Sequence, residues 1–208
     1  MGLVLYDNPR SSNALKVRFM LAELGLDHER RLVPFDRPRP GWYLAVNPVG
    51  GIPALEDDGL VVSESNTILR YLAGRERRVD LYPGEPRERA PVDELLDRWS
   101  LTFRPAFFRY EVAALGFSPD KGVGAGAPDT AALPGIVAAI APTLRLLDGL
   151  VDRSGFALGR FTIADVAAAP VLYRTLHSGL DLGPYPNVLR WRETIVALPA
   201  LAAAGPVL

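Results

Sequence analysis

The chain has 208 residues, of which 49% are hydrophobic and 23% are charged, an ordinary globular composition with enough length for two modest domains. Its formal net charge of −1 argues against the broad basic field that attracts nucleic acids and anionic membranes. The sequence has no cysteine, which excludes disulfides, cysteine-ligated metals and any mechanism in which the protein supplies a thiol. Any sulfur chemistry therefore needs a sulfur atom on a substrate.

Targeting, membrane and metal signals are also missing from the pattern. No apolar core typical of a signal peptide follows Met1, and the apolar stretch 195–208 contains two prolines and is too short to span a bilayer. No sequence pattern pairs either histidine, His28 or His177, with a serine and a carboxylate, which argues against a hydrolase triad. We therefore expect a cytoplasmic protein without membrane, nucleic-acid or metal partners.

The N-terminal third alternates strand and helix patterns. Apolar runs predict strands at 3–6, 28–33, 52–56 and 60–62, and helical spacing predicts helices at 12–24 and 65–74. This order, βαβ followed by ββα, is typical of a four-stranded mixed sheet with helices on its faces. We expect one α/β domain over residues 1–75.

Strand patterns disappear after a polar segment rich in arginine and proline, which we interpret as a linker over residues 76–90. Helical spacing then predicts an all-α domain over residues 91–208, with helices at 92–115, 131–150, 163–176 and 188–197. Thr162 followed by Asp165 has the spacing of a capping box at the start of the third helix. The glycines of segment 121–128 follow no strand, which argues against a dinucleotide-binding loop.

A proline lies where a loop enters the third predicted strand, within the segment Asn-Pro-Val-Gly-Gly-Ile-Pro-Ala-Leu at 47–55. An X-Pro bond in that place favours a cis peptide at Ile52-Pro53. Backbone groups of Ile52 that the sheet does not pair are then available to a peptide ligand lying as an added strand. The alternative is that Pro53 only ends the loop.

Glu64 and Ser65 lie at the predicted start of the next helix. One interpretation is structural: Ser63 or Ser65 caps the helix and Glu64 complements its dipole. The other uses the same groups for a ligand, since free N–H groups and a hydroxyl bind a carboxylate, while Glu64 pairs with an ammonium. A γ-glutamyl group carries both charges.

Two serines, Ser11 and Ser12, lie between the first strand and its helix. They are candidates for the helix N-cap. A hydroxyl there can also stabilise a ligand thiolate: lowering a thiol pKa by two units takes roughly 2.7 kcal/mol. A charge-assisted hydrogen bond supplies roughly 1.5–3 kcal/mol, and the helix dipole adds to it.

Together these segments resemble the cytosolic glutathione transferase (glutathione S-transferase) family, serine type, over nearly the whole chain. Segments 47–55 and 62–72 look like its glutathione-site signature, and 161–166 followed by Pro170 looks like its capping-box segment. The resemblance implies a thioredoxin-like N-terminal domain, an all-helical C-terminal domain and glutathione as co-substrate. It also implies a homodimer and a role in detoxification.

The resemblance also assigns roles to residues. Gly51, Ile52 and Pro53 correspond to the positions that hold the cysteinyl part of glutathione, and Glu64 and Ser65 to those that hold its γ-glutamyl end. Many relatives carry Lys or Gln where this chain has Gly51. Glutathione therefore binds more weakly here, or an arginine of segment 37–39 takes over that contact.

By the resemblance, Ser11 corresponds to the thiolate-stabilising serine of serine-type members. Ser12 corresponds to the equivalent residue of some other classes. We name Ser11 as the first candidate and Ser12 as the second. Tyr6 occupies a strand position where some classes carry a catalytic tyrosine, and we interpret it as a packing residue.

The helical domain supplies a stripe of aromatic side chains, of which Phe103, Phe107 and Tyr110 are our candidates for the pocket of a small apolar electrophile. Such a stripe is also typical of a helix core. Pro105 interrupts the segment and predicts a kink. Arg104 and Arg109 are either solvated or positioned to orient an anionic group.

The function implied is conjugation of the glutathione thiolate to a small apolar electrophile. Three alternatives stay open: a glutathione-dependent isomerase, a peroxidase or disulfide reductase acting through bound glutathione, and a non-catalytic binding module with the same fold. The departure at Gly51 keeps the last of these open, because function belongs to a site and not to a fold.

Overall fold

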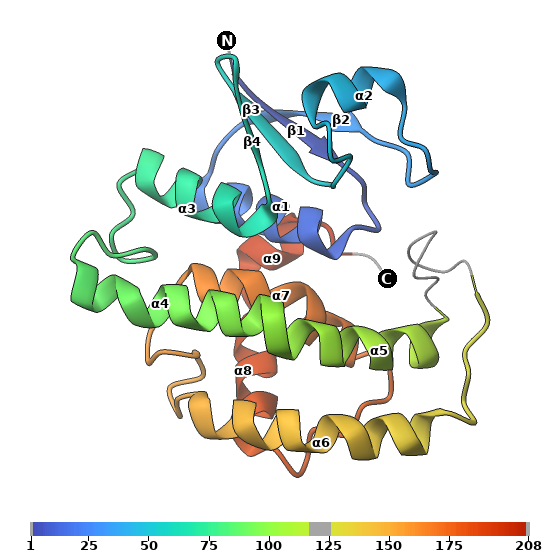
Figure 1. Ribbon diagram of the computed structural model, residues 1–208. Coiled ribbons are helices and arrows are strands. Elements are labelled where there is room, and N and C mark those ends of the chain that lie inside the picture. The colour runs from blue at the N-terminus through green and yellow to red at the C-terminus, as the bar shows by residue number, and fades with distance from the viewer. Residues whose placement is uncertain (1, 117–125, 207–208) are drawn as a thin grey trace.

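The computed structural model describes residues 2–116 and 126–206. An α/β unit and an all-helical unit lie one above the other (Figure 1). The α/β unit contains, in chain order, β1 (Leu3–Asp7), α1 (Ser12–Leu24), β2 (His28–Leu32), α2 (Gly41–Val46), β3 (Ala54–Asp57), β4 (Leu60–Ser63) and α3 (Ser65–Arg75). These elements confirm the predicted thioredoxin-like order.

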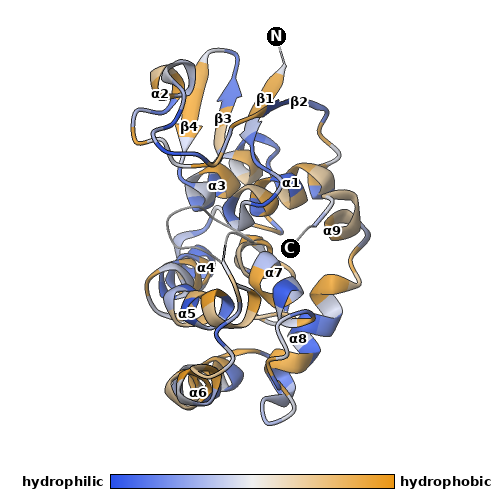
Figure 2. Ribbon diagram, turned by 90° about the vertical axis from the view of Figure 1, so that its right-hand side faces the viewer, coloured by the Kyte–Doolittle hydropathy of each residue, from blue (hydrophilic) through white to orange (hydrophobic). Residues whose placement is uncertain are grey.

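The four strands form one mixed sheet in the order β2-β1-β3-β4, with β1 parallel to β2 and the other neighbours antiparallel. Side chains alternate across it, so Leu3 and Leu5 join the core under α1 and α3, whereas Tyr6 packs with Tyr43 of α2. Helices α1 and α3 therefore lie between the sheet and the helical unit (Figure 2).

The helical unit begins earlier than the sequence predicts. Its elements are α4 (Pro86–Arg98), η1 (Trp99–Phe103), α5 (Arg104–Leu115), α6 (Leu133–Leu150), α7 (Ile163–Thr175), α8 (Pro186–Val196) and α9 (Pro199–Ala203). Pro86 is the first residue of α4, and Glu85 caps it through the Glu88 N–H, so the helix starts inside the predicted linker. A proline at the first helical position is favourable, since that N–H has no intrahelical partner.

The predicted helix at 92–115 is three consecutive segments rather than one. The middle one, η1, is a π-helical turn that ends just before Arg104 and Pro105. Pro105 has no N–H to donate, and a wider turn at that point accommodates the missing bond without breaking the rod. The short helix α9 is not predicted by the pattern because its five residues are too few to show a period.

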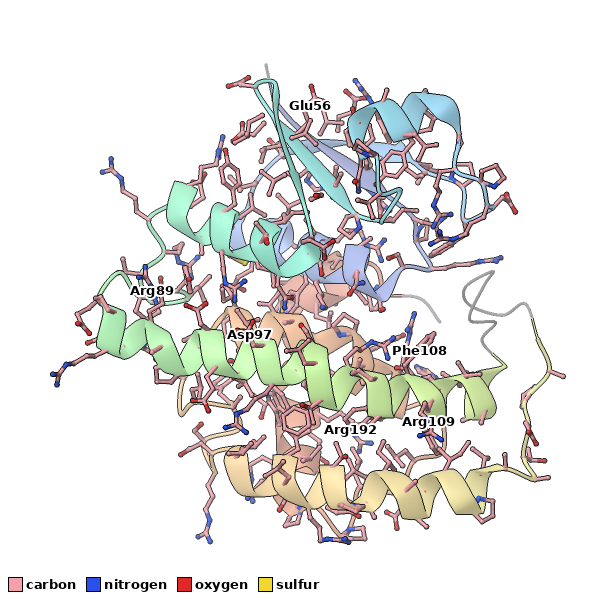
Figure 3. All side chains as sticks on the ribbon, in the orientation of Figure 1. Glu56, Arg89, Asp97, Phe108, Arg109 and Arg192 are labelled. Carbon is pink, nitrogen blue, oxygen red and sulfur yellow. The ribbon has the colours of Figure 1, made fainter. Side chains whose placement is uncertain are left out.

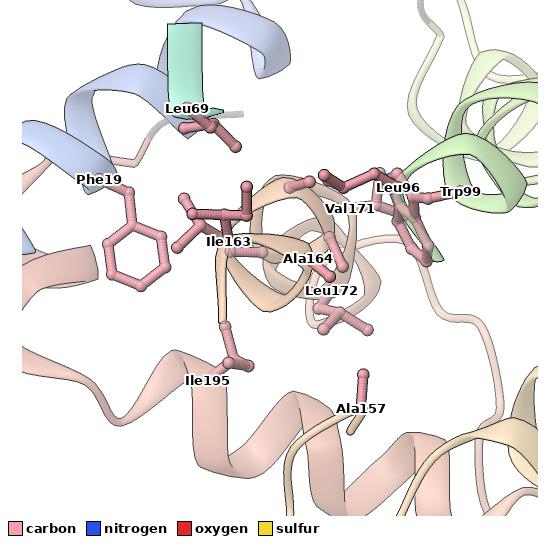
Figure 4. Close-up of a cluster of buried hydrophobic side chains, with 14 of the residues drawn as sticks. Phe19, Leu69, Leu96, Trp99, Ala157, Ile163, Ala164, Val171, Leu172 and Ile195 are labelled. Atoms are coloured by element: carbon pink, nitrogen blue, oxygen red, sulfur yellow. The ribbon is translucent and has the colours of Figure 1, made fainter. Parts of the chain in front are cut away.

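One hydrophobic core runs through both units. Helix α7 lies at its centre. Ile163 lies there toward Phe19 of α1, Leu69 of α3 and Ile195 of α8, whereas Ala164 lies on the side of Leu172 (Figure 4). The two units are thereby held in a fixed relation, since a packed interior deforms little.

Helix α6 is the one described helix long and apolar enough to cross a membrane, with a mean hydropathy of 1.4 over 18 residues. It packs against α5 and α8 on the outside of the helical unit. Of the glycine-rich segment expected at 121–128, residues 121–125 lie outside the described part of the chain.

Candidate active site

The Ile52-Pro53 peptide bond is cis, as the sequence predicts. Strand β3 begins only at Ala54, so Ile52 lies outside the sheet ladder. The preceding loop is fixed by its own side chains: the Asn47 amide donates to the Gly51 carbonyl at 2.9 Å, and the Tyr43 hydroxyl donates to the same oxygen. The loop is therefore a rigid edge beside the sheet.

Ser11 joins that loop to the start of α1. Its Oγ accepts from the Ala14 N–H at 3.1 Å and donates to the Ile52 carbonyl at 3.4 Å, and the residue is 8% exposed. Ser11 is thus the N-cap of α1, whereas Ser12 is the first helical residue and is partly exposed. The structure brings the Ser11 hydroxyl, and not only its backbone, next to Ile52.

The start of α3 lacks the cap that its sequence offers. Among the described residues, no side chain caps this helix, although Ser63 and Ser65 are both present. Glu64 precedes the helix with φ +66°, a conformation rare for a residue with a side chain. The helix N-terminus therefore keeps N–H groups for a ligand, beside the exposed carboxylate of Glu64 and the partly exposed hydroxyl of Ser65.

Lys16 is a site residue that sequence reasoning missed. It lies on α1, is 4% exposed, and directs its ammonium to Ser65 Oγ at 3.5 Å and Asn66 Oδ1 at 3.3 Å. Burial, and then repulsion from Arg104, lowers the pKa of Lys16 to about 7. The available signal was a lysine inside an apolar helical pattern, in a chain whose 23 basic residues are otherwise almost all arginine.

Helix α1 therefore connects the predicted elements of the site. Ser11 at its start contacts the Ile52 loop, and Lys16, a little over one turn further, contacts the start of α3. Glu64 and Ser65 come directly after β4, which pairs with the strand that Pro53 precedes. These contacts connect the three predicted segments in one neighbourhood.

Arg37 and Arg39 are the two predicted substitutes for the missing side chain at Gly51. Arg37 is exposed and stays a candidate, whereas Arg39 has other partners. Arg39 is 8% exposed and donates to the carbonyls of Gly50, Pro34 and Asp36 at 3.0, 2.8 and 3.2 Å. These bonds give it a structural role in the loop between β2 and α2.

Tyr6 packs as expected and its hydroxyl has partners away from Ser11. It donates to Glu56 at 2.7 Å and accepts from Arg31 at 3.2 Å, while the ring lies against Trp42 and Tyr43. Burial and the hydrogen bond to Glu56 raise the pKa of the Tyr6 phenol. A raised pKa leaves the phenol protonated and suits a packing residue.

The aromatic stripe of the helical unit lies in the core. Phe103, Phe107 and Tyr110 are 0%, 1% and 3% exposed, and the Tyr110 hydroxyl donates to the Ser178 carbonyl at 2.8 Å. Trp99 stacks between Phe103, Phe107 and Trp191. Their part in a second-substrate pocket stays a prediction, and Phe108 is the aromatic residue of α5 that is partly exposed.

The capping box is confirmed and is structural. Asp165, fully buried, accepts from the Thr162 N–H at 2.8 Å, from the Ala157 N–H at 2.9 Å and from Trp191 Nε1 at 2.8 Å. It thereby ties the start of α7 to α8 and to the preceding loop. Within the described ranges, no group of three or more His, Cys, Asp or Glu side chains is placed to hold a metal ion.

The fold and the site define a class: a thioredoxin-like domain with a cis-proline loop and an uncapped ligand-facing helix, joined to an all-helical domain. Family profiles refine it. Residues 10–75 match "Glutathione S-transferase, N-terminal domain" and residues 130–194 match "Glutathione S-transferase, C-terminal domain".

Individual relatives agree over almost the full length. The chain is 30% identical to glutathione S-transferase GstB of Escherichia coli K12, covering 96% of this chain and 95% of that one. It is 32% identical to a probable maleylacetoacetate isomerase of Caenorhabditis elegans, covering 98% and 92%. A theta class glutathione S-transferase from Xanthomonas axonopodis, solved with glutathione bound, superposes with a TM-score of 0.83 at 25% identity, covering 100% and 99%. The chain belongs to the glutathione S-transferase family.

Proposed function

We propose that this protein is a glutathione transferase that conjugates the glutathione thiolate to a small apolar electrophile. The observation that carries the proposal is the uncapped start of α3, where Glu64 and Ser65 offer a carboxylate, a hydroxyl and free N–H groups. Those groups match the ammonium and the carboxylate of a γ-glutamyl end. Solved relatives with glutathione bound support the same ligand.

Glutathione in this proposal lies along the cis-proline loop. Gly51, Ile52 and Pro53 hold its cysteinyl part as an added strand, which directs the sulfur toward the start of α1. Because the Ser11 Oγ lies 3.4 Å from the Ile52 carbonyl, it is beside the position that this strand brings the sulfur to. We assign the thiolate-stabilising role to Ser11, and Ser12 is the alternative.

In the reaction, the protein supplies stabilisation of the thiolate and proximity. The Ser11 hydroxyl turns from the Ile52 carbonyl to donate to the sulfur, and the positive end of α1 adds to the effect. The sulfur then attacks the electrophile, which lies between the thioredoxin-like domain (1–75) and the helical domain (91–208) that follows the linker (76–90). Phe103, Phe107 and Tyr110 shape the helical wall in this proposal.

The cellular setting is part of the same proposal. We infer a cytoplasmic homodimer with a role in detoxification, since the net charge of the chain is only −1 and the family match spans both domains.

Conjugation is tested with 1-chloro-2,4-dinitrobenzene, a flat apolar electrophile from which a thiolate displaces chloride. We expect adduct formation at a rate proportional to enzyme concentration, reduced about tenfold or more in Ser11→Ala, because one charge-assisted hydrogen bond is lost. Binding of glutathione without enzyme-dependent adduct formation from any electrophile tried would leave only a binding module.

A glutathione-dependent isomerase is the second candidate, favoured by the 32% identity to the probable maleylacetoacetate isomerase. An isomerase adds the thiolate to a double bond and then releases it. Glutathione measured before and after turnover separates the two functions, because conjugation consumes one glutathione per product and isomerisation consumes none.

A further inference from the structure

A cavity of about 320 Å³ lies along the second half of α1, away from the candidate active site. It extends from Arg18 to the C-cap Gly25, roughly 10 to 20 Å along the helix from Ser11. Helix α9 lies beside α1 there (Figure 2), and residues of β2 complete the lining. Its volume is at the lower end of the range for ligand pockets, roughly 300–1,000 Å³, so it suits a small molecule.

Strand β2 directs two basic side chains toward this cavity. His28 pairs with Leu3 and Arg30 pairs with Leu5 in the parallel ladder of β2 and β1. Leu3 and Leu5 lie on the face of the sheet that α1 covers, and paired residues of neighbouring strands share a face. His28 and Arg30 therefore point to the side of α1, and both line the cavity.

Arg30 has hydrogen-bonding capacity that the protein does not use. The fully buried Asp7 accepts from Arg18 Nη1 and from Arg30 Nε, each at 2.9 Å, and Arg30 Nη2 donates to it as well. One carboxylate thus serves two guanidinium groups. Arg18 is 4% exposed and also donates to the Ala204 carbonyl, whereas 44% of the Arg30 side chain is exposed and its Nη1 has no partner among the described residues. Arg30 can therefore pair with a ligand carboxylate.

The opposite charge lies at the turn between α1 and β2. Asp27 lines the cavity, is exposed, and makes no hydrogen bond or ion pair within residues 2–116 and 126–206. It follows the C-terminus of α1, where carbonyl groups without an intrahelical partner form the negative end of the helix dipole. A carboxylate beside a helix C-terminus attracts an ammonium.

The remaining lining is apolar. It comes from the C-terminal part of α1 and from the end of α9, and its side chains are Leu21, Ala22, Leu26, Ala203 and Ala204. The cavity therefore combines an available guanidinium, an available carboxylate and an aliphatic wall. A small zwitterion with an aliphatic group has the complementary chemistry.

We propose that this cavity binds a free α-amino acid with an aliphatic side chain. Its carboxylate pairs with Arg30, its ammonium pairs with Asp27, and its side chain lies against Leu21 and Leu26. The site is separate from the proposed transferase function and does not depend on it. The γ-glutamyl end of glutathione carries the same two charges without an aliphatic side chain, so the experiment has to distinguish the two sources.

Three related probes separate the two charges. L-leucine carries both, 4-methylpentanoate is leucine without the ammonium, and 3-methylbutylamine is leucine without the carboxylate. Each is titrated into the isotope-labelled protein while amide NMR signals are followed. We expect leucine to cause saturable shifts at the amides of Ala22, Leu26 and Ala203. Each analogue should bind about tenfold more weakly or worse, since each lacks one charge-assisted contact, and saturating glutathione should leave leucine affinity unchanged.

Two variants should give opposite patterns. Arg30→Gln should weaken leucine about tenfold and leave 3-methylbutylamine unchanged, whereas Asp27→Asn should weaken leucine and leave 4-methylpentanoate unchanged or tighter. Arg31→Gln is the matched control. Arg31 points to the other face of the sheet and donates to the Tyr6 hydroxyl, which donates to Glu56 on the side of α2 (Figure 3).

Thermal unfolding checks that each variant is folded, because Arg30 also pairs with the buried Asp7. Where Arg30→Gln does not fold, Asp27→Asn decides, since Asp27 is exposed. Absence of saturable shifts at the lining amides would overturn the inference. So would equal affinity for leucine and either analogue, which would leave a site for an anion or a cation alone. Displacement of leucine by glutathione would assign the site to glutathione instead. None of these results requires catalysis, so failure here and failure of the transferase function are distinct.

Discussion

The Ser11 hydroxyl makes two hydrogen bonds within the protein, and only one of them caps a helix. The bond from the Ala14 N–H is an N-cap, while the donation to the Ile52 carbonyl at 3.4 Å is long and easily exchanged for a thiolate. A single serine can therefore cap α1 and stabilise a sulfur anion at the same time.

Removing that hydroxyl separates the two roles. Ser11→Ala should lower the free energy of unfolding by about 0.5–2 kcal/mol through the lost cap. It should also move the thiolate absorbance titration of bound glutathione to higher pH by roughly 1–2 pH units. Ser12→Ala is the matched control. A titration that moves in Ser12→Ala and not in Ser11→Ala would exchange their assignments.

Gly51 is a position where a longer side chain fits. Its φ is not in the left-handed region, and a Cβ placed there would lie 3.7 Å from Asn47 Nδ2 as its nearest neighbour. We expect Gly51→Gln to tighten glutathione binding by about fivefold, the worth of about one added hydrogen bond, as measured by calorimetry. Gly50→Ala is the contrast, because φ is +70° there and the added Cβ would meet Arg39 at 3.0 Å, so it should destabilise the loop.

Much of the candidate site followed from local sequence rules. The cis bond before Pro53 and the position of Glu64 before a helix are short-range features, and the pattern predicts both. The hydrogen bond of Lys16 with Ser65 and the repulsion it feels from Arg104 could not be predicted, because they depend on how three elements pack in the whole fold. The same holds for Arg39, whose carbonyl partners depend on how one loop closes.

At the scale of elements, the start of α7 is fixed by one buried carboxylate. Asp165 accepts four hydrogen bonds in a fully buried setting, and one of them comes from the indole of Trp191 on α8. The capping-box spacing predicts the bonds with Thr162. The pattern gives no indication of the tie to α8, which depends on tertiary packing.

Truncating that carboxylate should cost much more than removing an exposed cap. We expect Asp165→Ala to lower the free energy of unfolding by at least about 3 kcal/mol, because several buried donors lose their acceptor. Glu85→Ala, at the exposed N-cap of α4, should cost only about 1 kcal/mol. Urea denaturation of both variants gives the comparison, and similar losses would show that Asp165 acts as an ordinary cap.

Helix boundaries were the least predictable part of the fold. The segment 92–115 has helical spacing throughout, and the π-helical turn before Pro105 leaves that spacing almost unchanged. The earlier start at Pro86 is determined by the Glu85 cap, in a segment whose composition resembles a linker. Periodicity identifies the buried face of a helix, while its ends depend on a few capping bonds.

For the whole molecule, the packing of one domain on the other buries a titratable ammonium, that of Lys16, at the boundary. Lys16 faces Arg104 from α5 and is attracted by Glu64, and burial with repulsion lowers its pKa from 10.5 to about 7. The unfolded chain therefore holds more protons than the native state between about pH 7 and pH 10.5. The free energy of unfolding therefore rises with pH across that window. Below it, the native state carries the full cost of burying the charged Lys16 ammonium.

Lys16→Met removes the titration and keeps the apolar stem. The free energy of unfolding of the variant, minus that of the wild type, should increase as the pH is lowered from 10 to 7, because only the wild type has a buried charge to accommodate. Guanidinium denaturation at several pH values measures the difference. A difference that stays constant with pH would mean that Lys16 is solvated as a normal lysine.

The central claim is that the start of α3 and the cis-proline loop bind glutathione, and calorimetric titration with glutathione tests it most directly. We predict saturable binding by the wild type that weakens about tenfold or more in Glu64→Ala and in Ser65→Ala, since each loses a charge-assisted contact. Glu88→Ala, an exposed carboxylate on α4, should bind as the wild type does. Absence of heat at millimolar glutathione, or equal affinity in all four proteins, would contradict the account.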